Sequence, residues 1–74
     1  MTGKVKEQIL KVRETGLVNM FDTSGVQYVA YQQDSYDLVN YLKEKDNIKE
    51  YIHFIMTGEA IITDEEDSAG EETD

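Results

Sequence analysis

The residues best suited to chemistry are few in this chain, and they do not combine into a catalytic set. His53 is the only histidine, and there is no cysteine, which excludes thiolate nucleophiles and zinc–thiolate sites. On a helix, Glu50 would lie one turn before His53 and could orient it, but an exposed surface histidine is the simpler interpretation. The sequence has no glycine-rich phosphate loop and no metal-binding histidine pair. We therefore expect a protein that is not an enzyme and needs no cofactor or metal.

The acidic residues are unevenly distributed along the chain, whose net charge is −9. Residues 1–58 carry eight acids and seven Lys or Arg, whereas residues 59–74 carry eight acids and no base. We expect residues 59–74 to form a disordered acidic tail, because so few apolar groups cannot offset the entropy of ordering. Asp64, Glu65, Glu66 and Asp67 lack the ligand spacing of a calcium loop. They either solubilise the protein or bind a basic partner. A third alternative is that they compete with nucleic acid by occupying the phosphate channel of such a partner.

Aromatic residues are frequent for so small a chain, with five tyrosines and two phenylalanines. If residues 26–31 are helical and Val26 and Ala30 face the core, Tyr28 or Tyr31 is left near the surface. Tyrosine is enriched at protein interfaces, where one end of the side chain is apolar and the other is wet. Tyr28, Tyr31 and Tyr36 are therefore candidate partner-binding residues. The alternative is that these rings pack in the core or at its rim.

The elements that would position these residues are helical. Val5, Ile9 and Val12 recur at helical spacing, and Gly16 follows them where a left-handed residue ends many helices, so we predict a helix over residues 2–15. Residues 16–26 then connect this helix to the next, and Leu17 is expected to make an apolar contact at its end. The second helix begins at Asp22, with Phe21 and Val26 as a hydrophobic staple, or at Ser24 in a capping box with Gln27. A strand over residues 26–31 is the alternative.

The second half of the chain carries two further apolar patterns. Asp34 or Ser35 can cap a helix that contains the stripe Leu38, Val39 and Leu42. Residues 48–55 then give the clearest helical period, which Gly58 closes. Asp46 either caps this last helix or lies inside it, so residues 34–57 form one helix or two. The prediction is an all-α domain of three or four helices over residues 1–58, followed by the acidic tail.

Three runs of residues resemble a family of very small proteins. They are residues 4–10 (KVKEQIL), 15–23 (TGLVNMFDT) and 51–58 (YIHFIMTG). The family is an uncharacterised domain encoded by phages and prophages of Gram-positive bacteria, and the similarity covers about residues 4–58. The resemblance implies a phage accessory protein in a bacterial cytoplasm, but it carries no functional residue with it.

These observations together lead to one preferred function and two alternatives. No segment approaches the roughly 20 apolar residues of a membrane span, and the first residues do not form a signal peptide, so we expect a cytoplasmic protein. The preferred function is binding to a host protein, such as a basic nucleic-acid-handling or defence protein, in order to modulate or inhibit it. The first alternative is a structural protein of the phage particle that acts by self-association, since a chain this small gains burial as a homodimer. The second is a small DNA-binding regulator, which the lack of clustered Lys and Arg on one helix disfavours.

Overall fold

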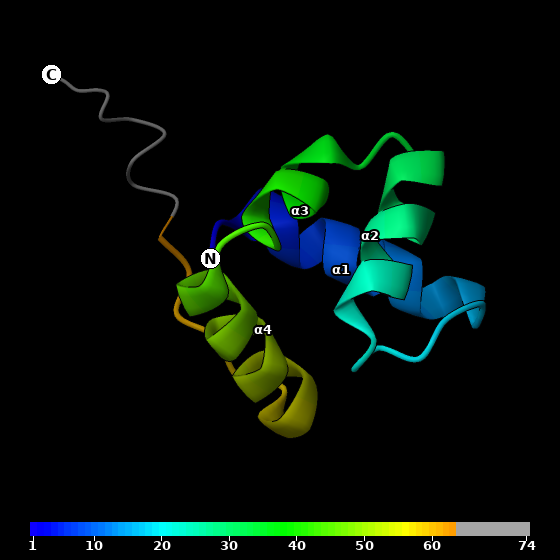
Figure 1. Ribbon diagram of the computed structural model, residues 1–74. Coiled ribbons are helices and arrows are strands. Elements are labelled where there is room, and N and C mark those ends of the chain that lie inside the picture. Colours follow the sequence, from blue (N-terminus) through cyan, green and yellow to red (C-terminus); the bar gives the residue numbers. More distant parts are fainter. Residues whose placement is uncertain (64–74) are drawn as a thin grey trace, which may run out of the picture.

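The computed structural model describes residues 1–63 and contains four helices in this part of the chain (Figure 1). They are α1 (Gly3–Thr15), α2 (Thr23–Gln32), α3 (Tyr36–Tyr41) and α4 (Lys45–Thr57). The predicted all-α fold is confirmed, and the alternative of a strand over residues 26–31 is wrong. Residues 34–57 form two helices rather than one. Within residues 1–63, no helix has the length and apolar character needed to span a bilayer.

The ends of the first two helices follow the expected chemistry. The Thr2 hydroxyl accepts a hydrogen bond from the Val5 amide at 3.1 Å and caps α1, which ends at Gly16 with a left-handed φ of 66°. An Asp22 carboxylate oxygen accepts from the Gly25 amide at 3.1 Å, so α2 begins at the Asp22 cap and not at Ser24. These contacts are local, which explains why the sequence pattern located both ends.

The break between α3 and α4 lies slightly before the predicted position. Glu44 is the N-cap residue of α4, and Asp46 lies in its first turn instead of capping it. The Asn47 side-chain amide donates to the Tyr41 carbonyl at 3.0 Å, across the break. This bond satisfies a carbonyl that the end of α3 leaves without a helical partner. The last helix ends at Gly58, whose φ of 78° is left-handed as predicted.

The core forms where α1, α2 and α3 pack against one another, and α4 closes it. The α1 stripe is buried as predicted, and α2 and α3 contribute Val26, Ala30 and Leu38. From α4 the buried side chains are Tyr51 and Phe54, whereas its three isoleucines are only partly buried. The buried apolar residues are Met1, Val5, Ile9, Val12, Val26, Ala30, Leu38, Leu42, Tyr51 and Phe54.

The connection between α1 and α2 divides its apolar side chains between the core and the solvent. Val18 and Met20 pack against the core, but Leu17 is 76% exposed and Phe21 is 54% exposed. Leu17, which was expected to make an apolar contact, therefore buries little of its side chain, and less than half of Phe21, the expected staple partner of Val26, is buried. The absence of a side chain at Gly25 lets Val18 lie close to the start of α2, because a Cβ at Gly25 would lie 2.6 Å from a Val18 methyl carbon.

Tyr51 joins α4 to the same connection. Its side chain is fully buried, and its hydroxyl donates to the Met20 carbonyl at 2.6 Å. Burial raises the pKa of Tyr51 to about 12, since the charged phenolate is disfavoured away from water. The hydroxyl thus remains a hydrogen-bond donor throughout the neutral range.

A side chain from α1 completes the first turn of α3. Ser35 occupies the N-cap position but makes no side-chain capping hydrogen bond. Instead, Gln8 Oε1 accepts from the Leu38 amide at 2.8 Å. This contact links residues 30 positions apart in the sequence, and it satisfies one of the amides that every helix start leaves unpaired.

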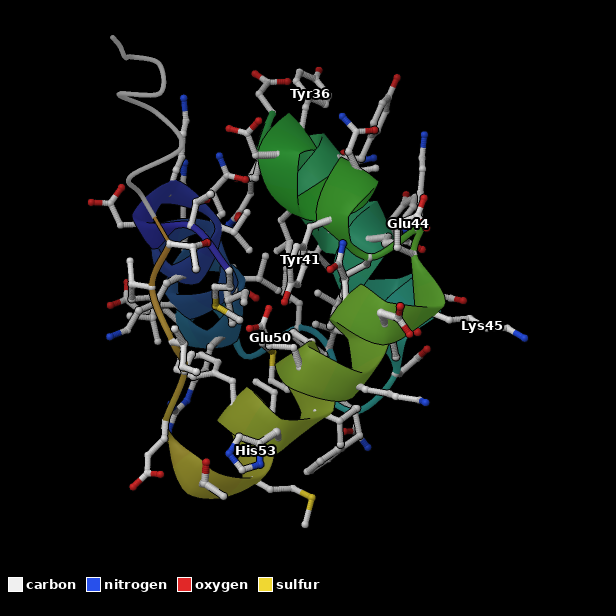
Figure 2. All side chains as sticks on the ribbon, turned by 90° about the vertical axis from the view of Figure 1, so that its left-hand side faces the viewer. Tyr36, Tyr41, Glu44, Lys45, Glu50 and His53 are labelled. Carbon is white, nitrogen blue, oxygen red and sulfur yellow. The ribbon has the colours of Figure 1, made fainter. Side chains whose placement is uncertain are left out.

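Glu50 connects three parts of the chain. Figure 2 shows Tyr41 and Glu50 pointing toward one another between α3 and α4, and the Tyr41 hydroxyl donates to Glu50 Oε1. The same oxygen lies 3.0 Å from the N-terminal ammonium of Met1. Residues 59–63, which the sequence placed with the tail, run back beside α4, and the Thr63 amide donates to the Met1 carbonyl at 2.9 Å (Figure 1).

Replacing Tyr51 by Phe should lower the free energy of unfolding by about 1–2 kcal/mol, because it leaves the Met20 carbonyl without its donor.

The raised pKa of Tyr51 also makes the free energy of unfolding depend on pH. The stability that the Tyr51 hydroxyl contributes is complete below the unfolded tyrosine pKa of about 10 and is lost as the pH rises toward 12. Urea unfolding across this range, with tyrosinate absorbance, measures both effects. Tyr28→Phe, at an exposed ring, is the control and should change little. Equal effects of the two variants would contradict this account.

Replacing Glu50 by Gln tests the ion pair. Burial acts to raise the pKa of Glu50, but the hydrogen bonds from Tyr41 and the Met1 ammonium outweigh it and lower the pKa. The charged carboxylate therefore stabilises the fold above its unfolded pKa of about 4.3, and this contribution is lost as the pH falls through the lower folded value. At neutral pH the Gln variant should be less stable by about 1 kcal/mol. In unfolding titrations this difference should shrink in acid, and a difference that does not depend on pH would contradict the assignment.

Candidate protein-interaction surface

The helix α2 differs from the other three because it carries no charged residue. Nearly a third of the whole chain is charged, so this absence sets one helix apart. Val26 and Ala30 face the core, while Tyr28 is 65% exposed and Tyr31 is 59% exposed. Depletion of charge together with exposed tyrosine is the composition found in the centre of protein interfaces.

A third tyrosine extends this surface onto α3. The rings of Tyr31 and Tyr36 meet edge to face, with their centroids 5.7 Å apart and their planes at 67°. Tyr36 is itself 48% exposed and stands at one end of the view in Figure 2, with His53 at the other. We call Tyr28, Tyr31 and Tyr36 the tyrosine surface. The structure therefore brings Tyr31 and Tyr36 into contact, places Tyr28 one turn before Tyr31 on α2, and leaves all three exposed.

The turn between α2 and α3 holds the tyrosine pair in place. The Ser35 amide donates to the Ala30 carbonyl at 2.8 Å, and the Asp34 amide donates to the Tyr31 carbonyl at 3.1 Å. This pair of bonds is the Schellman motif, which places a left-handed residue at Asp34. Its φ is 60°, a region that glycine usually occupies and that aspartate tolerates at a small cost. The backbone conformation alone therefore does not account for aspartate at this position.

The Asp34 side chain makes a hydrogen bond with Tyr36. The Tyr36 hydroxyl donates to Asp34 Oδ1 at 2.8 Å. This hydrogen bond, followed by desolvation and the nearby negative charge, raises the pKa of Tyr36. The hydroxyl thus stays protonated and continues to hold the carboxylate. The sequence indicates Asp34 only as a candidate helix cap, because residue spacing does not reveal its contact with Tyr36.

Other candidate groups are arranged differently. His53 is exposed and lines a hollow of about 440 Å³ with Glu50, Glu59, Ala60 and Ile61. The Glu50 carboxylate bonds to Tyr41 and the Met1 ammonium, not to His53. Among residues 1–63, no group of three histidine or acidic side chains is placed to hold a metal ion. The four acidic candidates Asp64, Glu65, Glu66 and Asp67 lie outside the described residues.

The fold and this surface define a small helical domain with an aromatic, charge-depleted face. The chain belongs to the family described as a domain of unknown function, DUF5049, whose sequence profile matches residues 1–59. No curated protein and no solved structure matches the chain. The family match thus covers all four helices.

Substitutions at Asp34 test the left-handed turn. We expect Asp34→Asn and Asp34→Gly to change the free energy of unfolding by less than about 0.5 kcal/mol, because both residues adopt this conformation readily. Asp34→Ala should cost about 1 kcal/mol, since alanine is strained there and offers no acceptor to Tyr36. Chemical unfolding of the three variants measures this order. Alanine as stable as asparagine would show that the backbone conformation is not what limits this position.

Proposed function

We propose that this protein is a small non-enzymatic phage accessory protein that binds a host protein and modulates or inhibits it. The observation that carries the proposal is the tyrosine surface, with Tyr28 and Tyr31 on the uncharged helix α2 and Tyr36 at the start of α3. Its three rings are exposed in a chain so small that most large apolar side chains are needed for its core. Exposed tyrosines of this kind supply contact area with little loss of conformational entropy on binding.

The assignment to a phage or prophage of a Gram-positive bacterium rests on the resemblance of residues 4–58, and the cytoplasm of that host follows from it. The net charge of −9 favours a basic target and speeds its capture by long-range attraction. Host proteins that handle nucleic acid or act in defence present such surfaces. Asp64, Glu65, Glu66 and Asp67 would add to this attraction.

A capture experiment with matched variants tests the proposal. One variant replaces all three residues of the tyrosine surface by serine, which has a similar helix propensity. The control variant replaces Leu17 and Met56, which are 76% and 70% exposed and lie elsewhere, by serine. We expect a stoichiometric partner from a Gram-positive host lysate to bind the natural protein and the control, and to be lost by at least tenfold with the tyrosine variant.

The result has clear alternatives once circular dichroism shows that both variants are folded. A partner retained by the tyrosine variant would overturn the proposed site. No stoichiometric partner for any form, with light scattering that shows growing assemblies, would instead support a structural protein of the particle.

A further inference from the structure

The chemistry of the partner can be narrowed further, because Tyr36 of the tyrosine surface contacts the carboxylate of Asp34, which makes no ion pair among the described residues. Among the described residues, the ion pairs are those of the Met1 ammonium with Glu50 and of Lys4 with Asp37. Asp34 is exposed and makes neither. Its described side-chain contact is the hydrogen bond from Tyr36, which engages one oxygen and leaves acceptor positions on the carboxylate.

We propose that Tyr31, Asp34 and Tyr36 form a receptor for an arginine side chain of a basic protein segment. This inference rests on the proposed function and specifies the partner of the same surface. The two rings stand at 67° to one another, and the hydroxyl of one of them, Tyr36, donates to the Asp34 carboxylate. A planar guanidinium stacks on a tyrosine face and directs its edge donors to a carboxylate, which a lysine ammonium does less well.

The receptor is held in its shape before any ligand arrives. The hydrogen bond from Tyr36 fixes the Asp34 carboxylate, and the Schellman turn fixes the backbone that joins it to Tyr31. A preorganised site loses less entropy on binding. Tyr28 lies one turn before Tyr31 on α2, where it can contact the apolar part of the same bound segment.

Charge selects a basic segment over the other occupants of such a surface. Residues 1–58 are nearly neutral and most of the net charge of −9 lies in residues 59–74, so a second copy of this chain or a nucleic acid would bring further negative charge to a chain that is acidic as a whole. The hollow that Asp34 lines on its side away from Tyr36 does not favour a basic segment in the same way. This hollow of about 350 Å³ is also lined by Lys4, Glu7 and Lys11, so that two positive and two negative charges balance.

The test is an NMR titration of the full isotope-labelled chain with a blocked peptide of arginines separated by glycines. The lysine and glutamine versions of the peptide are run in parallel. We expect saturable shifts at Tyr28, Tyr31 and residues 34–36, with arginine binding more tightly than lysine and glutamine not binding. Asp34→Asn keeps the turn and the acceptor for Tyr36 but removes the charge, and it should weaken the arginine peptide about fivefold. The control Asp46→Asn makes the same change in net charge at the start of α4 and should have little effect.

The outcomes separate this inference from the function on which it rests. Equal weakening by Asp34→Asn and Asp46→Asn, shifts confined to the acidic residues 64–74, or equal binding of the glutamine peptide would each overturn the receptor. Concentration-dependent shifts of the same resonances without peptide would identify a second copy as the occupant, and would also overturn it. If the receptor fails while the serine variant of the tyrosine surface still loses its host partner, the proposed function stands. If both experiments fail, the surface is not a binding site.

Discussion

The fold depends on the contact between the Tyr51 hydroxyl and the Met20 carbonyl, which joins residues 31 positions apart in the sequence. Among the described residues, Tyr51 is the largest fully buried side chain, and it extends from the last helix to the connection between the first two. A chain of this size has few residues to bury, so one large side chain that fills the centre and also satisfies a backbone group serves two needs. Without it, α4 would be held mainly by Phe54 and by isoleucines that are only partly buried.

The same economy explains how α2 can combine weak helix formers with the proposed contact site. Its valines, tyrosines and glycine are mediocre helix formers, and no charged pair supports it. Its support is tertiary: Val26 and Ala30 are buried, and the Gln27 side-chain amide donates to the Val39 carbonyl of α3 at 3.0 Å. Because the inner face provides this stability, the outer face is free to carry aromatic rings instead of charges.

The sequence was sufficient wherever the deciding interaction is local. Gly16, Asp22 and Gly58 act on backbone groups within a turn, and the stripe through Val5, Ile9 and Val12 depends only on helix geometry. The predictions failed where a distant group intervened. Leu17 is exposed although its position suited a contact with α1, because Val18 and Met20 occupy the core side of the connection. Ser35 is the N-cap residue of α3, but its side chain makes no capping hydrogen bond, and Gln8 supplies an acceptor from another helix.

The sequence by itself therefore determined the helical class, most helix ends and the expectation that Tyr28 or Tyr31 lies near the surface, since these follow from turn chemistry and a period of 3.6 residues. Only the tertiary structure decided that Tyr31 and Tyr36 touch, that Asp34 between α2 and α3 makes no ion pair among the described residues, and that Glu50 faces Tyr41 rather than His53. Residue spacing along one helix does not specify the angle between two helices. That angle depends on how buried side chains of different helices fill a shared space, and it sets which surface groups become neighbours.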